Sequence, residues 1–314
     1  TDNGDGTFNV ITRHNMSSNA DAEAAEIILY DIHDTAFNRT EYLQASSVKP
    51  IPDENADPIF ISDSTFSVEE NETAIGTVSA RNAKGDALKV IGSKGINMIN
   101  LRTEWTGGPK STNGAYGFYP VESEDVLIDG CVAIGASDAG IYVGQSKNII
   151  VRNSTAQYNV AGIEIENSYY ADVYNNLASH NTGGILIFDL PDLPQQGGHH
   201  IRVFDNKSID NDTDNFAPEG NIVGEVPRGT GIIIMANSDV EVFNNEMSGN
   251  GTVNLSIVSY SDETDDPNYY PHPRRIQVHN NIYGPGGFDP DGIIGPFDKF
   301  GISISNNLSL TPYT

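Results

Sequence analysis

The chain has 314 residues, a net charge of −26 and only 17 lysine and arginine residues. So acidic a chain excludes a nucleic-acid partner and an anionic membrane surface, because both attract basic proteins. No apolar run reaches the roughly 18 residues of a membrane-spanning helix. No signal peptide is recognised at the N-terminus, and we interpret this as a leader that has already been removed.

Residues 1–80 are acidic and show no internal repeat. We predict that they form a cap or extension of a repeat domain at residues 81–314. Residues 20–29 place acidic side chains in their first half, which favours a short helix. The stretch Phe66-Ser-Val-Glu-Glu-Asn-Glu-Thr73 resembles the opening strand of a cadherin-type repeat. We interpret residues 60–80 as extended strand leading into the repeats, with a cadherin-like module as the alternative.

A repeat of about 22 residues begins after this segment. Gly140-Ile-Tyr-Val143, Gly162-Ile-Glu-Ile165 and Gly184-Ile-Leu-Ile187 each start 22 residues after the one before. Further short apolar strands occur at residues 149–151, 172–174, 202–204, 241–243, 277–279 and 303–305. Strands at a fixed period without helical spacing predict an all-β solenoid with one coil per repeat.

Asparagine recurs at two places in the repeat. The first set is Asn153, Asn175, Asp205, Asn244, Asn280 and Asn306, and the second is Asn159, Asn181, Asn211 and Asn250. Asparagine tolerates tight turns, and stacked side-chain amides satisfy one another. Both sets are therefore predicted to be ladders that stabilise the coils. Cys131, the only cysteine, is predicted to be a buried structural thiol.

Strand alternation assigns one exposed face of the coils. Ile141, Ile163 and Ile185 are predicted to point inward, which turns the residues after them outward. The outward columns then hold Tyr119, Tyr142, Gln145, Glu164, Glu166 and Asp189. Tyrosine rings pack against sugar rings, and carboxylates and amides bind hydroxyl groups. We predict a groove for a linear sugar chain, with a plain solvated strand face as the alternative.

Residues 102–116 precede this face and bring together two cations and the only tryptophan. Arg102 and Lys110 are predicted to contact an anion, with an ion pair to Glu104 as the alternative for Arg102. Trp105 and His200 are added to the predicted sugar-binding residues. Insertions at residues 189–198, 215–228 and 261–273 interrupt the coils, and such loops often carry binding sites.

The coils are similar to a known family over residues 85–292. The stretches Gly130-Cys-Val-Ala-Ile-Gly-Ala-Ser-Asp-Ala-Gly-Ile-Tyr-Val-Gly-Gln145, Ala161-Gly-Ile-Glu-Ile-Glu-Asn167 and Gly183-Gly-Ile-Leu-Ile-Phe-Asp-Leu-Pro191 resemble bacterial parallel β-helix repeat proteins. This resemblance implies a right-handed parallel β-helix and carries no particular activity.

More broadly, the coils resemble carbohydrate-active β-helices such as pectate lyases, alginate lyases and mannuronan C5-epimerases. The epimerases carry a Tyr-Gly-Phe-Asp-Pro-His motif, and the matching stretch here is Tyr116-Gly-Phe-Tyr-Pro-Val121. Tyr119 and Val121 replace the acidic residue and the histidine. A lyase would act by β-elimination or C5 proton abstraction, which needs a base and a charge neutraliser. Tyr116 or Lys110 is the candidate base, and Arg102 or a bound Ca²⁺ the neutraliser.

Two functions therefore remain as hypotheses. The first is a secreted, cell-surface or periplasmic protein that binds or acts on an acidic polysaccharide, with Ca²⁺ as the candidate cofactor. The second is a non-catalytic structural protein that self-associates, such as an extracellular fibre, adhesin or surface-layer subunit. Convergence of Lys110, Tyr116, Tyr142, Glu164 and Asp189 in one cleft would favour the enzyme.

Overall fold

The computed structural model describes residues 87–260 and 266–291 with their side chains. Outside these ranges it describes the backbones of β1 (Ala25–Tyr30), β2 (Leu43–Gln44), β3 (Ile59–Phe60), β4 (Thr65–Phe66), β5 (Ala74–Arg81) and β27 (Leu308–Leu310). The predicted strand at residues 303–305, with Asn306, lies outside the described residues. Among the described residues, no helix has the length and apolarity that crossing a membrane requires.

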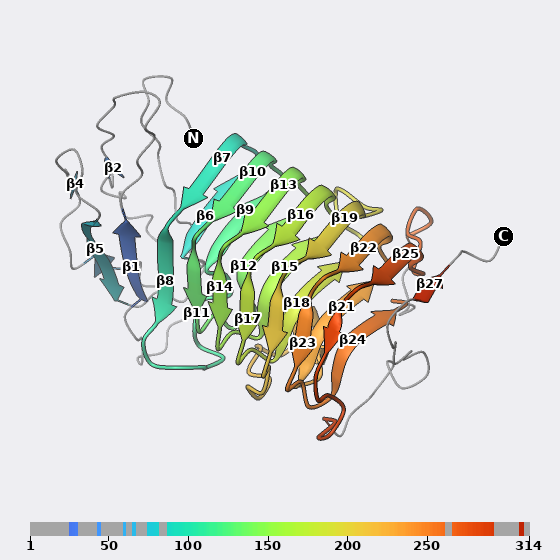
Figure 1. The fold of residues 1–314 in the computed structure, drawn as a ribbon. Helices are drawn as coiled ribbons and strands as arrows, with labels where there is room; N and C mark the ends of the chain where they lie inside the picture. Colours follow the sequence, from blue (N-terminus) through green and yellow to red (C-terminus); the bar gives the residue numbers. More distant parts are fainter. Residues whose placement is uncertain are drawn as a thin grey trace.

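Each coil contributes one strand to each of three parallel sheets, named S1, S2 and S3 in the order in which the chain visits them (Figure 1). S1 contains β6 (Leu88–Ile91), β9 (Phe118–Val121), β12 (Ala139–Gly144), β15 (Ala161–Glu166), β18 (Gly183–Phe188), β21 (Thr230–Met235) and β24 (Val253–Val258). S2 contains β7 (Lys94–Ile99), β10 (Glu124–Asp129), β13 (Lys147–Arg152), β16 (Tyr169–Tyr174), β19 (His199–Phe204), β22 (Ser238–Phe243) and β25 (Arg274–His279). S3 contains β8 (Leu101–Trp105), β11 (Val132–Ile134), β14 (Thr155–Gln157), β17 (Leu177–Ser179), β20 (Lys207–Ile209), β23 (Glu246–Ser248) and β26 (Ile282–Tyr283). This topology is a parallel β-helix.

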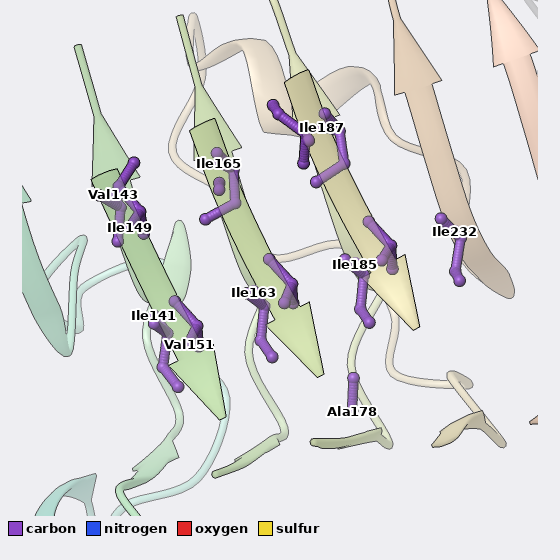
Figure 2. Packing of buried hydrophobic residues seen from close by; sticks show 14 of the residues in the cluster. Ile141, Val143, Ile149, Val151, Ile163, Ile165, Ala178, Ile185, Ile187 and Ile232 are labelled. Carbon is purple, nitrogen blue, oxygen red and sulfur yellow. The ribbon is translucent and has the colours of Figure 1, made fainter. Parts of the chain in front are cut away.

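Like residues stack on like residues from coil to coil. Ile141, Ile163 and Ile185 are register partners on β12, β15 and β18, and all three are fully buried. Valine and isoleucine side chains of S2 pack against side chains of S1 across the interior. Figure 2 shows this for Ile149 of β13 in S2 and Val143 of β12 in S1. The inward positions predicted from strand alternation are therefore confirmed, as is burial of Cys131.

One of the two predicted asparagine ladders is shifted by one residue. Asn159, Asn181, Asn211 and Asn250 form the second ladder as predicted, with amide-to-amide hydrogen bonds of 2.9–3.1 Å. The first set instead adopts left-handed backbone at the end of the S2 strands, where φ is 51–56°. The ladder is built by the following residues, Asn176, Asn206, Asn245 and Asn281. The left-handed residue turns the chain, which points the next amide into the interior.

The predicted helix at residues 20–29 is wrong, because β1 occupies residues 25–30. β1 pairs antiparallel with β8 on one side and with β5 on the other. It thereby covers the edge that S3 would otherwise expose at its first coil, and pairing of that edge outweighs local helical preference. At the other end, β27 pairs antiparallel with β25 of S2 (Figure 1). The predicted domain boundary near residue 80 stays a prediction.

Three insertions fold over the outer face of S1. They are residues 189–198 between β18 and β19, residues 213–228 between β20 and β21, and residues 266–272 before β25, and we call them together the cover. The 213–228 segment contains a short 3₁₀ helix, Ile222–Glu225. Val223 and Val226 pack in one apolar cluster with Leu186 and Phe188 of β18.

The predicted exposure of the outward S1 columns is therefore wrong for their central part. Tyr142, Glu164 and Leu186 do point away from the interior, as strand alternation requires, yet they are only 4%, 1% and 0% exposed. The cover removes them from solvent. Strand alternation specifies the side of a sheet on which a residue lies, and it does not specify what covers that side.

Candidate functional site: a tyrosine cluster over buried carboxyls

Three tyrosines meet on the outer face of the first S1 strands. Tyr116 precedes β9, Tyr119 lies on β9 and Tyr142 lies on β12. The ring centroids are 4.2 Å apart for Tyr116 and Tyr119, 4.7 Å for Tyr116 and Tyr142, and 4.9 Å for Tyr119 and Tyr142. Tyr116 and Tyr119 are half-buried, whereas Tyr142 is buried. The cluster thus has one face at the surface and one beneath the cover.

A lysine belongs to the surface side of this tyrosine cluster. Lys89 of β6 is the register partner of Tyr119, and its Nζ atom lies 4.2 Å from the centroid of the Tyr119 ring. A cation at this distance is attracted by the ring's negative face. The site therefore combines apolar ring surface with one positive charge.

Tyr142 connects the cluster to a carboxyl on the next coil. Its hydroxyl donates a hydrogen bond of 2.6 Å to Oε1 of Glu166 on β15. The ring reaches Glu166 by lying across Gly144, where a Cβ atom would come within 2.1 Å of the Tyr142 hydroxyl. Gly144 is also the register partner of Glu166. Absence of a side chain at residue 144 is what permits this contact.

Two further carboxyls lie beneath the cover, Glu164 beside Glu166 and Asp138 beside Glu164. Glu164 is the register partner of Tyr142 and is 1% exposed, and its Oε2 atom has no hydrogen-bond partner. Asp138, 6% exposed, lies in the turn before β12 and accepts a 3.0 Å hydrogen bond from the Asn221 amide of the cover. Burial raises the pKa of Glu164 well above its usual value, and the carboxyls of Asp138 and Glu166 raise it further.

The pKa values of the other buried groups are raised for the same reason. Burial raises the pKa of Glu166 to about 7, although the hydrogen bond from Tyr142 acts in the opposite direction. Burial also raises the pKa values of Tyr116 and Tyr142 well above the usual value of a phenol. These raised pKa values favour the neutral forms of the two tyrosines and of Glu164.

Asp189 holds the cover in place rather than lining a groove. Its carboxylate is 1% exposed and accepts hydrogen bonds of 3.1 Å and 2.8 Å from the backbone N–H groups of Gly197 and Gly198. Its backbone carbonyl accepts a 2.7 Å hydrogen bond from the Tyr269 hydroxyl. Burial raises the pKa of Asp189 to about 6, while the two N–H donors lower it.

Gln145 lies at the corner between S1 and S2, beside the tyrosine cluster. It lines a hollow of about 440 Å³ together with Lys94, Glu122, Lys147 and Gln195. Its Oε1 atom is buried without a hydrogen-bond partner. This corner extends the candidate surface toward S2.

The remaining predicted site residues do not join this site. Arg102 lies on the outer side of β8 in S3, where it pairs with Glu104, so it faces a different side of the coil from Tyr116. Lys110 is exposed in the loop between β8 and β9. Trp105 is 2% exposed and packs against Ala87 and Ala136, so its ring presents no face to a ligand. Lys110, Tyr116, Tyr142, Glu164 and Asp189 therefore do not form one open cleft.

His200 lies on S2, within a separate surface. It lines an open hollow of about 910 Å³ with Tyr170, Arg202, Asp239 and Arg275. The charges there are paired, Arg202 with Asp172 and Arg275 with Asp239. Among the described residues, no group of three or more histidine, cysteine, aspartate or glutamate side chains is arranged to hold a metal ion.

Sequence reasoning missed Lys89, Asp138 and Asn221. Lys89 is the register partner of Tyr119 in the preceding coil, so aligning one more repeat of the sequence would have identified it. Asp138 and Asn221 are 83 residues apart and meet through the hydrogen bond between their side chains. No sequence pattern indicates that contact.

Comparisons with known proteins agree with this fold. The family model described as right handed beta helix region matches residues 54–211 and 86–265. No curated protein matches the chain. Two solved structures are similar. A double mutant of the periplasmic alginate epimerase AlgG has 17% identity and a TM-score of 0.43, over 62% of this chain and 46% of that one. The tailspike protein gp49 of Pseudomonas phage LKA1 has 11% identity and a TM-score of 0.33, over 88% and 44%. This chain thus spans less than half the length of either.

Proposed function

The chain belongs to the right-handed β-helix family, and on that premise we propose that it binds an acidic polysaccharide at the tyrosine cluster. The observation that carries the proposal is the placement of the Lys89 ammonium over the ring of the half-buried Tyr119, which packs against Tyr116 and Tyr142. Sugar rings pack against the tyrosine rings, and a uronate carboxylate pairs with the lysine.

The local charge supports an anionic ligand even though the whole chain carries a net charge of −26. Glu164 lies one strand behind Tyr142, and burial raises the pKa of its carboxyl. A raised pKa favours the uncharged carboxyl, which repels an anion bound at the tyrosine cluster less than a carboxylate would. Ca²⁺ belongs to the proposal as a bridging ion between the acidic protein and the acidic polymer.

Binding is better supported than β-elimination or C5 epimerisation. Either reaction needs a base near the sugar and a cation at its carboxylate. The raised pKa of Tyr116 disfavours the tyrosinate form that would act as the base, and Arg102 lies on another face of the coil. Secretion to the cell surface or periplasm is part of this proposal, because such polymers occur there.

The test measures affinity for soluble alginate, polygalacturonate and ulvan, with neutral dextran as the comparison polymer. Calorimetric titrations are run with Ca²⁺ and with EDTA, and absorbance near 235 nm is followed for unsaturated products. We expect uronate-selective binding that weakens about fivefold in Tyr119→Ala, because a stacked ring contributes about 1 kcal/mol. Lys89→Gln should weaken binding to the uronates.

The matched control is Tyr158→Ala, which removes an exposed tyrosine that stacks on His180 rather than on the cluster. It should bind as the wild type does. Equal binding of dextran, or unchanged affinity in Tyr119→Ala, would contradict the proposal. Absence of binding together with growth of light scattering at increasing protein concentration would favour the structural, self-associating protein instead.

A further inference from the structure

The cover and the carboxyls beneath it form a further functional unit, whose role rests on the proposed function. We propose that Glu164 is a latch: while its carboxyl is protonated the cover stays closed over S1, and ionisation opens the cover and releases an acidic polysaccharide. The proposal concerns residues 213–228 above all, because this segment contacts the carboxyl of Asp138 through Asn221.

The 213–228 segment is anchored at its ends, where Thr213 donates to the backbone carbonyls of Asn181 and His180 and the Arg228 backbone N–H donates to Asp291. Between these ends it contacts the carboxyls and S1 through a polar contact and an apolar patch. Asn221 donates to Asp138, which is one of the two carboxyls that act on Glu164. Val226 lies against Gly183 of β18, where a Cβ atom would come within 2.9 Å of its Cγ1 atom. Asn215 holds the segment's own shape by donating to the carbonyls of Val223 and Val226. The segment can therefore move as a unit.

Glu164 is the group beneath the cover that is least able to hold a charge. Its Oε2 atom is buried and has no hydrogen-bond partner. Its neighbours across the register are Tyr142 on β12 and Leu186 on β18, which offer a neutral hydroxyl-bearing ring and an apolar side chain. A protonated carboxyl tolerates these surroundings far better than a carboxylate does.

The carboxyls that act on Glu164 would repel an ionised Glu164 carboxylate rather than stabilise it. Asp138 and Glu166 act on it directly, Tyr116 and Tyr142 interact with it, and Asp189 acts on Glu166. Lys89 lies over the Tyr119 ring on the first strands of S1, and Glu164 lies on β15. The charged residues of the 213–228 segment are Asp214, Glu219, Glu225 and Arg228, and Arg228 pairs with Asp214 and Asp289.

An ionised Glu164 would therefore be solvated only if water entered from the S1 side. β15 cannot move for this purpose, because it is paired with β12 and β18 along its length. The middle of the 213–228 segment lies over S1 through the side chains of Asn221, Val223 and Val226. Backbone hydrogen bonds anchor the segment only near Thr213 and Arg228, so lifting its middle is the easier response. Opening then places the carboxylates of Glu164 and Glu166 beside a bound polyanion, which favours release.

Hydrogen exchange measured by mass spectrometry tests the latch in the free protein, with no polysaccharide present. Protection of residues 213–228 is followed from about pH 6 to about pH 10 and corrected for the intrinsic exchange rate. We expect protection to fall by about tenfold in the wild type as pH rises. Glu164→Gln, which mimics the protonated carboxyl, should keep the segment protected throughout.

Two further variants make the result decisive. Glu246→Gln removes an exposed carboxylate that pairs with Lys207, and it should behave as the wild type does. Asn221→Ala should loosen the segment at every pH, which shows that the measurement detects opening. A pH-dependent loss of protection in Glu164→Gln equal to that of the wild type would overturn the latch.

The link to the polysaccharide is measured separately. Alginate affinity should fall with rising pH in the wild type and stay constant in Glu164→Gln. Absence of alginate binding at any pH would overturn the proposed function while leaving the exchange result standing. Constant protection in the wild type would overturn the latch while leaving binding intact.

Discussion

At the scale of single residues, the candidate site depends on side chains that are absent as much as on those present. Gly144 leaves the space in which the Tyr142 ring crosses to Glu166. Glu164 lies between its register partners Tyr142 and Leu186, where burial raises the pKa of its carboxyl. These local arrangements decide which groups are charged at neutral pH, and they are open to direct test.

Gly144→Ala should disrupt the tyrosine–carboxyl contact. The new Cβ atom would lie 2.1 Å from the Tyr142 hydroxyl, so the ring must shift and its hydrogen bond to Glu166 is lost. We expect a loss of about 1–3 kcal/mol in the free energy of unfolding, measured by urea denaturation. Gly224→Ala is the control, because its Cβ atom would meet Ala217 at 3.7 Å, an ordinary contact. Equal stability of the two variants would refute this role of Gly144.

Glu166 should make the wild type lose stability as pH rises. Folding raises its pKa from 4.5 to about 7, so between these values the folded chain binds more protons than the unfolded chain. The free energy of unfolding is therefore highest below pH 4.5 and falls as pH rises toward 7. Relative to Glu166→Gln, the wild type should lose about 3 kcal/mol across this window.

Urea denaturation at a series of pH values between 4 and 8 measures this difference. Glu246→Gln again serves as the control, since that carboxylate is exposed. It should follow the wild-type profile. A Glu166→Gln profile parallel to that of the wild type would show that the Glu166 carboxyl does not titrate in this range.

At the scale of elements, the turns between strands carry most of the buried polar interactions. The Asn206 side chain accepts from the backbone and side-chain N–H groups of Asn176 and donates to Asn245 and to the carbonyl of Val173. One amide thus ties three successive coils together. The sheets supply the apolar interior, and the ladders satisfy the polar groups at the corners where the chain changes sheet.

Asn206→Ala should be among the more damaging single substitutions in the described coils. It leaves the buried partner groups of Asn176 and Asn245 unsatisfied, and each unsatisfied group costs about 1–3 kcal/mol. We expect a loss of about 2–5 kcal/mol in urea denaturation. Asn97→Ala, at an exposed position on β7, should change stability by about 0.5 kcal/mol or less. Comparable losses in the two variants would rule out a special contribution from the ladder.

At the scale of the whole molecule, two features stand out: a long stack of coils and a net charge of −26. Antiparallel pairing covers S3 at the N-terminal end through β1 and S2 at the C-terminal end through β27. Such pairing protects the edges of a solenoid from association. The charge favours solubility, and its self-repulsion works against the compact state.

Added salt should therefore stabilise the protein. Screening shortens the Debye length from about 10 Å at 0.1 M to about 3 Å at 1 M, which weakens repulsion among the carboxylates. We expect the melting temperature to rise by several degrees between low and high NaCl, measured by calorimetry. KCl should act equally if the effect is screening, and CaCl₂ at matched ionic strength should add to it only if Ca²⁺ binds. A melting temperature that falls with NaCl would contradict this expectation.

The sequence by itself determined the coil. Ile141, Ile163 and Ile185 recur every 22 residues, so the period, the strands and the inward side of each strand could all be predicted. This succeeded because each coil packs mainly on its neighbours, which makes the fold a local property repeated along the chain. The Asn159 ladder could be predicted for the same reason. In the other ladder two adjacent asparagines occur in most repeats, so the sequence did not specify which of the two forms the ladder.

Only the tertiary structure decided what lies over S1. In the cover, Asn221 contacts Asp138 and Tyr269 contacts Asp189. Neither contact follows the 22-residue repeat. These contacts turned a predicted open groove into buried carboxyls. Arg102, Trp105 and His200 lie apart from Tyr116 because their strands belong to S3 and S2. Alternation along a strand depends on the backbone alone, but burial and pKa depend on every segment that folds back onto the strand, and that information is not local in the sequence.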